Sequence, residues 1–145
     1  MNAEPKIYFF LEEVRYNLRK KRNIRSWIIQ TAENEDYKIG TLNYILTNDE
    51  ILVQLNRDYL RHFTLTDIIT FDLSENEGLL TGDIYISVDR AKENAKKFKE
   101  TVNNEIKRLM IHGILHLVGY KDKSTSDREL MRAKEEYYLS LATWS

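Results

Sequence analysis

The chain contains no cysteine, one proline and only five glycines among its 145 residues. The lack of cysteine excludes a disulfide framework and a thiolate metal site, which leaves His, Asp and Glu as the strong metal ligands. No Ser-rich or Gly-rich stretch and no fixed-period repeat divides the sequence. We therefore expect a single domain over residues 1–145, a length at which one hydrophobic core is usual.

An excess of charge of one sign is also missing. The 22 Lys and Arg nearly cancel the 23 Asp and Glu, and the net charge is -1. Such a chain has no overall field that attracts polyanions, so any affinity for nucleic acid has to come from a local patch. No stretch approaches the roughly 20 apolar residues of a membrane span, and residues 1–11 lack a signal-peptide pattern. These absences predict a cytoplasmic protein with no membrane partner.

The hydrophobic pattern predicts alternating strands and helices in the first half of the chain. Apolar or alternating runs indicate strands at 7–11 and 42–46, and helical spacing indicates a helix over 24–32. Thr47 and Glu50 form a capping-box pattern, which predicts a helix that runs to about Leu60.

A hairpin and three helices are predicted for the second half. Segments 67–73 and 83–87 are rich in β-branched and aromatic residues and flank a turn-prone segment. Helical spacing predicts helices over 88–98 and 106–117, and Ser126 with Glu129 predicts the cap of a last helix. The sum is an α+β domain, a mixed sheet of about four strands with four or five helices.

Two histidines separated by four positions are the main candidates for chemistry. His112 and His116 lie on a strongly apolar predicted helix, so both imidazoles leave the same face and can share a metal ion. Gly119 can adopt the left-handed conformation that ends a helix, which lets the chain turn back and bring Asp122 toward the same point. Three protein ligands leave a coordination position for water, as in catalytic sites. We therefore predict a metal-dependent hydrolase.

Gly113 weighs against a metalloprotease. It stands where H-E-x-x-H proteases carry the glutamate that serves as general base. The motif itself thus supplies no base, and peptide hydrolysis is disfavoured unless a carboxylate from elsewhere reaches the site.

Residues 112–120 read H-G-I-L-H-L-V-G-Y, and they resemble the H-G-x-L-H-L-x-G-Y signature of the YbeY endoribonucleases, also called rRNA maturation factors. Three earlier segments are similar in order and spacing: Leu55-Asn56, T-D-I-I-T-F at 66–71 and G-D-I-Y-I-S at 82–87. The resemblance implies a single-domain α+β fold, a zinc ion and a single-strand-specific endoribonuclease acting in 16S rRNA processing and ribosome quality control. It also implies rRNA as the substrate, with ribosomal proteins or the small ribosomal subunit as partners.

The sequence departs from that family at two places. The family signature ends G-Y-D-H, whereas Asp122 occupies the third histidine position here. A carboxylate ligand makes a bound water less acidic and broadens the metal preference from Zn²⁺ toward Mn²⁺ or Fe²⁺. The family also usually has an arginine after the tyrosine that corresponds to Tyr59, where this chain has Leu60. Arg57 and Arg61 are the neighbouring candidates for a catalytic guanidinium that clamps phosphate.

Two groups of basic residues are further candidates for phosphate contacts. They are Arg19, Lys20, Lys21, Arg22 and Arg25, and, flanking the metal motif, Lys107, Arg108, Lys121 and Lys123. The first of these groups is equally consistent with an ordinary solvent-exposed turn. His62 is left unassigned, and structural roles are expected for Asp67, Asp72 and Asp83.

A non-catalytic ribosome assembly factor that binds RNA and keeps a structural metal is the alternative function. A structural zinc normally has four strong ligands and is closed to solvent, whereas only three are found here. The ligand count therefore favours catalysis.

Overall fold

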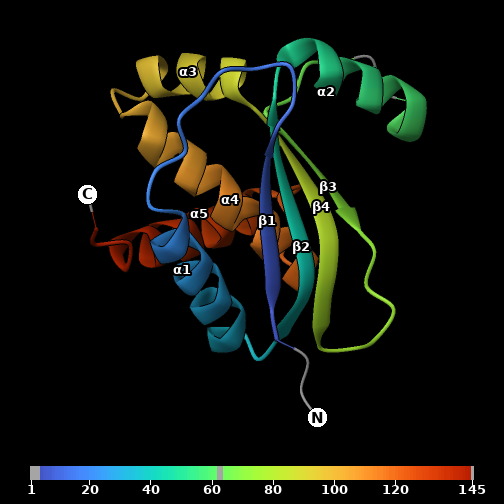
Figure 1. Cartoon of the computed structure of the whole chain (residues 1–145), viewed down its shortest axis with the longest axis vertical. Helices are drawn as coiled ribbons and strands as arrows, with labels where there is room; N and C mark the ends of the chain where they lie inside the picture. Colours follow the sequence, from blue (N-terminus) through green and yellow to red (C-terminus); the bar gives the residue numbers. More distant parts are fainter. Residues whose placement is uncertain (1–3, 62–63, 145) are drawn as a thin grey trace.

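The computed structural model describes residues 4–61 and 64–144 (Figure 1). Its elements in chain order are β1 (Lys6–Leu11), α1 (Lys21–Asn34), β2 (Lys38–Thr47), α2 (Asp49–Leu55), the π-helical turn η1 (Asn56–Leu60), β3 (Ile68–Asp72), β4 (Leu79–Ser87), α3 (Val88–Lys97), α4 (Val102–Val118) and α5 (Thr125–Ser140). Within these described ranges, no helix is both long and apolar enough to cross a bilayer.

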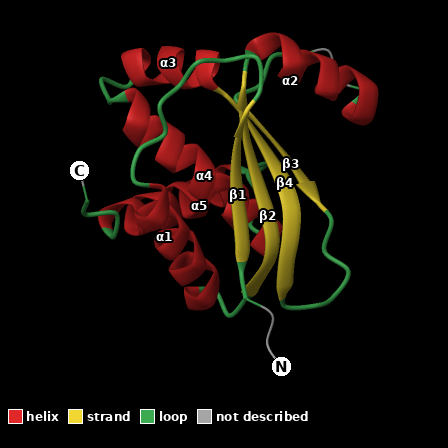
Figure 2. Cartoon of the chain, in the orientation of Figure 1, coloured by secondary structure: helices red, strands yellow, loops and turns green. Residues whose placement is uncertain are grey.

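The four strands form one mixed sheet in the order β1-β2-β4-β3. β1 pairs with β2 and β2 with β4 in parallel, whereas β3 and β4 form the predicted antiparallel hairpin. Parallel pairing needs a crossover, and α1 provides it between β1 and β2. Figure 2 shows α1, α4 and α5 gathered beside one face of the sheet, with α2 at one end. The α+β class and the mixed four-stranded sheet are confirmed.

Helix α4 runs through the middle of the core and crosses the sheet closely at Gly113. A Cβ atom on Gly113 would lie 2.9 Å from Ile84 Cδ1 and 3.3 Å from Ile68 Cδ1. A larger residue would therefore require the Ile84 and Ile68 side chains, or α4 itself, to shift. This close approach is a physical reason for glycine, and against glutamate, directly after the first histidine.

Two of the predicted helix caps are wrong. Asn48 caps α2, because its side-chain oxygen accepts the N–H of Ile51 at 2.9 Å, while the Thr47 hydroxyl donates to the Glu12 carbonyl at 2.7 Å. Thr47 remains the last residue of β2, and its side chain ties the chain after β1 to that strand. The predicted end at about Leu60 is confirmed, because η1 continues α2 to that residue.

The last helix begins two residues earlier than Ser126 suggested. Ser124 is its N-cap, and Ser124 and Asp127 form the reciprocal hydrogen bonds of a capping box. The sequence holds two overlapping capping patterns at this point, and the earlier one is used.

Candidate metal centre

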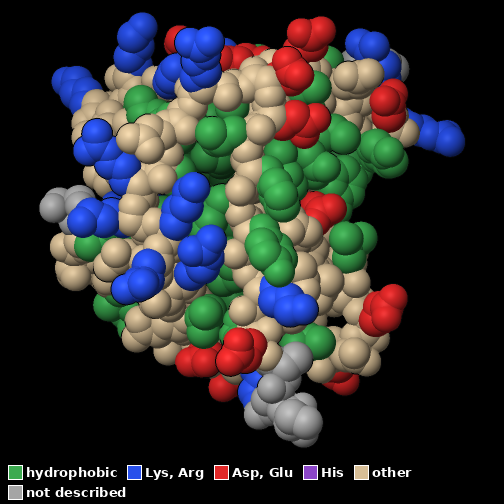
Figure 3. Space-filling view, viewed as in Figure 1, with side chains coloured by type: hydrophobic (Ala, Val, Ile, Leu, Met, Phe, Trp, Pro, Cys, Tyr) green, Lys and Arg blue, Asp and Glu red, His purple; other side chains and the backbone are tan. Residues whose placement is uncertain are grey.

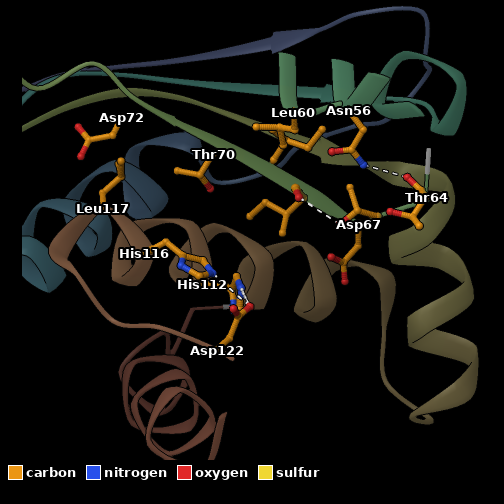
Figure 4. A pocket seen from close by; sticks show the side chains of 13 residues that line it. Asn56, Leu60, Thr64, Asp67, Thr70, Asp72, His112, His116, Leu117 and Asp122 are labelled. Carbon is orange, nitrogen blue, oxygen red and sulfur yellow. Dashed lines mark hydrogen bonds and ion pairs between the residues drawn. The ribbon is translucent and has the colours of Figure 1, made fainter. Parts of the chain in front are cut away.

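The three predicted ligands converge at the end of α4. His112 and His116 lie on its last two turns, and Gly119, with φ +121°, ends the helix. The chain then turns back, so that Asp122 Oδ2 lies 3.3 Å from His116 Nε2 and 3.6 Å from His112 Nε2. Figure 4 shows the carboxylate facing both imidazoles from the loop below the helix.

These separations fit a bound divalent metal ion. Ligand atoms of the three residues all lie within 4.8 Å of one another. In a tetrahedral site with metal–ligand bonds of about 2.0–2.1 Å, neighbouring ligand atoms lie about 3.4 Å apart. Two imidazole nitrogens and one carboxylate oxygen suit Zn²⁺, Mn²⁺ or Fe²⁺. The residues could therefore hold a metal with little rearrangement.

Glu135 of α5 orients the first histidine. Its Oε2 atom lies 2.6 Å from His112 Nδ1, and the glutamate is only 5% exposed. A carboxylate at this distance keeps the proton on Nδ1, which leaves the Nε2 lone pair facing Asp122. No spacing rule in the sequence points to Glu135, because it stands on a separate helix 13 residues after the third ligand.

Arg108 in turn holds Glu135, and its role as a phosphate contact stays a prediction. Its guanidinium donates to Glu135 Oε1 at 3.0 Å and to both carboxylate oxygens of Glu105 at 2.7 and 2.8 Å. Burial lowers the pKa of Arg108, but the bonds to Glu105 and Glu135 outweigh burial and raise it. Lys107 is buried as well, with Nζ 5.2 Å from the Trp144 ring centre. Lys107 is thus buried in the core, whereas Arg108 is 29% exposed, and its guanidinium lies 4.0 Å from Asp67 in the wall of the metal cavity.

A second carboxylate, Glu35 after α1, anchors the loop that carries Asp122. The Tyr120 hydroxyl donates to it at 2.6 Å, Lys134 Nζ donates at 3.1 Å, and the Tyr138 hydroxyl also donates. The cluster thus ties the loop to the end of α1 and to α5. It fixes the backbone two residues before the third ligand.

The Glu35 cluster makes a pH-dependent contribution to stability. Burial raises the pKa of Glu35, but the bonds from Tyr120, Tyr138 and Lys134 outweigh it and lower the pKa below its usual value. Stability from a lowered carboxyl pKa is present above the unfolded pKa of about 4.3 and is lost as the pH falls through the folded pKa. We expect Glu35→Gln to be less stable at pH 7, with a flatter decline of the unfolding free energy below about pH 4.3.

Urea unfolding of wild type and Glu35→Gln between neutral and acidic pH checks this. Glu33→Gln, at an exposed neighbouring position, is the matched control and should follow the wild-type curve. If the unfolding free energies of wild type and Glu35→Gln fell in parallel with pH, the charge of the Glu35 carboxylate would not contribute to stability.

A cavity of about 650 Å³ opens between β3 and α4, and the three ligands stand in its wall. Its other lining residues are mostly polar: Asn56, Leu60, Thr64, Thr66, Asp67, Ile68, Ile69, Thr70, Asp72 and Leu117. Carboxylates contribute three of the lining side chains, and none of the described lining residues is Lys or Arg. A cleft of this size with polar groups around a metal site suits a ligand.

The structure places the two predicted catalytic arginines outside this lining. Arg57 borders a different hollow, beside Asp49 and Glu50. Arg61 is exposed and ends η1 in a left-handed conformation, directly after Leu60, which does line the cavity. Their role as phosphate clamps stays a prediction.

Of the other polar residues considered in the sequence, the structure describes the three aspartates but not the histidine. His62 lies outside the described residues. The three aspartates make structural hydrogen bonds: Asp67 accepts from Asn94, Asp72 from the Ser74 N–H and Asp83 from Asn43.

Comparisons with known proteins agree on one family. The family model described as "Endoribonuclease YbeY" matches residues 10–142. A protein of that name from Cytophaga hutchinsonii is 52% identical over 138 residues, 95% of this chain and 96% of that protein. Another from Flavobacterium psychrophilum is 44% identical and covers 91% of this chain and 94% of its own length. A solution structure from Thermotoga maritima matches 94% of this chain and 88% of that one, with a TM-score of 0.67 and 26% identity.

Proposed function

Because this chain belongs to the YbeY family of endoribonucleases, we propose that it is a metal-dependent, single-strand-specific endoribonuclease acting in maturation of 16S rRNA and in ribosome quality control. The convergence of His112, His116 and Asp122 in the wall of an open cavity carries this proposal. An open cavity beside three ligands suits catalysis better than a structural metal, which is normally closed by four ligands.

His112, His116 and Asp122 would hold one metal ion, and we propose Zn²⁺, with Mn²⁺ or Fe²⁺ as alternatives because of the carboxylate ligand. When bound, such an ion supplies a Lewis acid that lowers the pKa of water and stabilises negative charge on a phosphate. Glu135 would contribute by favouring the His112 tautomer with the proton on Nδ1, in which the opposite nitrogen is free to be a ligand.

The cavity walls would position the RNA strand. The Thr70 hydroxyl can donate to phosphate or ribose oxygens, and the apolar side chains of Leu60 and Leu117 exclude water from one side. Arg57 follows Asn56 and Arg61 follows Leu60, both of which line the cavity, and we propose these two arginines as the candidate phosphate clamps. Lys121 and Lys123, exposed on either side of Asp122, would add further charge.

Cleavage of labelled RNA by the purified full chain tests the function. We expect single-stranded RNA to be cut and the matching duplex to be spared, with activity lost after chelation and restored by Zn²⁺ or Mn²⁺. Cleavage that survives complete removal of metal would contradict the proposal. A stoichiometric metal without any cleavage would instead favour an assembly factor with a structural metal.

A further inference from the structure

The metal cavity is poorly suited to supply affinity for a polyanion. Asp67, Asp72 and Asp122 line it, and the described lining residues include no Lys or Arg. A bound metal ion offsets part of this negative charge. Affinity of proteins for RNA comes largely from cations placed along the phosphate chain. A longer RNA must therefore obtain most of its binding energy outside the cavity.

The strongest cation cluster of the chain lies elsewhere. Residues 14–32 contain six Lys and Arg and no acidic residue, which leaves 16 Lys and Arg against 23 Asp and Glu in the remainder. All six side chains are exposed, and in the described part of the structure none forms an ion pair; they are Arg15, Arg19, Lys20, Lys21, Arg22 and Arg25. We call them the basic surface. Figure 3 shows several blue side chains over α1, with acidic groups below them at the other end of that helix.

This arrangement reduces the stability of α1. Lys21 and Arg22 stand in its first turn, no acidic residue offsets them, and the N-cap Lys20 makes no side-chain capping bond. Cations at a helix N-terminus are opposed by the helix dipole and by one another. A phosphate chain laid across these side chains would relieve that repulsion.

The segment leading into α1 holds the cations in a fixed position. Tyr16 and Leu18 face inward, with the Tyr16 hydroxyl donating to Asn103 Oδ1 at 3.1 Å and Leu18 buried in the core. The alternate residues Arg15 and Arg19 consequently face solvent. Unlike a mobile tail, this segment keeps its charges in place before a ligand arrives.

A small hollow adjoins the basic surface. It has a volume of about 140 Å³, and its lining includes Phe9, Leu11, Tyr16, Leu18 and Lys21. The Phe9 ring already stacks with Tyr44 and carries the Arg25 guanidinium 5.1 Å from its centre, so Tyr16 is the aromatic wall for a base. An aromatic ring beside a cation such as Lys21 suits a nucleobase that stacks while its phosphate is neutralised. In a duplex the bases are paired and cannot enter such a hollow.

From these observations we propose that the basic surface is a second binding site for single-stranded RNA, which holds the phosphate chain outside the metal cavity and takes one base in the adjoining hollow. This deepens the proposed function, since it rests on RNA being the substrate. Tyr16 contacts Asn103 on α4, and Asn103 lies about 20 Å from His116 at 1.5 Å per residue along the helix. An RNA of about 3 nucleotides, at about 3.4 Å each when stacked, does not bridge that separation.

The test compares long and short RNA. The variant Arg19→Gln/Lys21→Gln/Arg22→Gln removes three exposed cations, and Lys38→Gln/Lys92→Gln/Arg132→Gln removes three exposed cations elsewhere as the matched control. We expect the first variant to lose at least about tenfold in affinity for single-stranded RNA of about 25 nucleotides. The slope of log affinity against log salt should fall by about 2, at about 0.7 per lost contact. Its melting temperature should be unchanged or higher, and its kcat/KM on RNA of about 3 nucleotides should not change.

Binding is measured by fluorescence anisotropy on full chains that also carry His116→Ala, so that the probe is not cut. Wild-type affinity and salt slope in the first variant, or an equal loss in the control, would overturn the proposal. Equal affinity for a duplex of the same length would overturn the placement of a base in the hollow. If the unmodified chain cleaved no RNA of either length, the proposed function would fail, while the anisotropy result would still decide the binding site.

Discussion

His116→Ala is expected to fold normally and to lose both its bound metal and at least about a thousandfold of its RNA-cleavage rate. Only two of the three ligands would remain, so the ion would be lost. The stabilisation of transition-state charge that the ion supplies, several kcal/mol, would be lost with the ion. The side chain of His116 is 30% exposed, so little packing is lost with the ring. The melting temperature of the metal-free variant should therefore stay close to that of the metal-free wild type.

Elemental mass spectrometry measures the bound metal, single-turnover cleavage measures the rate, and thermal unfolding measures the melting temperature, all on the same preparations. Lys121→Ala is the matched control, because it alters an exposed side chain beside Asp122 without removing a ligand. Near-unit metal in His116→Ala would mean that another group completes the site. Loss of the metal with full activity would mean that cleavage does not use the ion.

Glu135→Gln should weaken metal binding about 10-fold to 100-fold while the chain stays folded. The amide is nearly the same size as the carboxylate, but it cannot hold the proton on His112 Nδ1 with the strength of a charged acceptor. Arg108 would keep both bonds to Glu105. The variant thus changes the orientation and basicity of one ligand more than it changes the core.

Competition with a chelator of known affinity gives the metal dissociation constant, and thermal unfolding of the metal-free proteins reports packing. Glu136→Gln, the exposed neighbour on α5, should leave both values unchanged. If Glu135→Gln lowered the melting temperature but left metal affinity at the wild-type value, Glu135 would be a structural residue only.

The group of three residues that could hold a metal was predictable from the sequence because its geometry is local. A separation of four residues on one helix fixes two imidazoles on the same face, and Gly119 marks where the chain can reverse. The strands and helices were predictable for the same reason, since hydrophobic period and turn residues act over a few positions. The family resemblance then added the substrate class, which no spacing rule contains.

The groups around the ligands could not be predicted in this way. Glu35 and Glu135 reach the site only through the packing of α1 and α5 against α4. No sequence-spacing rule predicts which residues these two glutamates contact. Arg108 is a candidate phosphate contact because of its place beside the motif, and only the fold shows that its guanidinium also holds Glu135. The helix caps predicted at Thr47 and Ser126 were wrong because a nearby residue, Asn48 or Ser124, can also cap the same helix.

The two glutamates also set the order in which the site can become functional during synthesis. All three ligands lie within residues 112–122, yet the partner of His112 is on α5, which leaves the ribosome last of the described helices. Tyr138 and Lys134, which brace the Asp122 loop through Glu35, are on the same helix. A nascent chain that ends before α5 therefore carries all three candidate ligands without the contacts that align them, and we expect it to bind metal more weakly than the full chain.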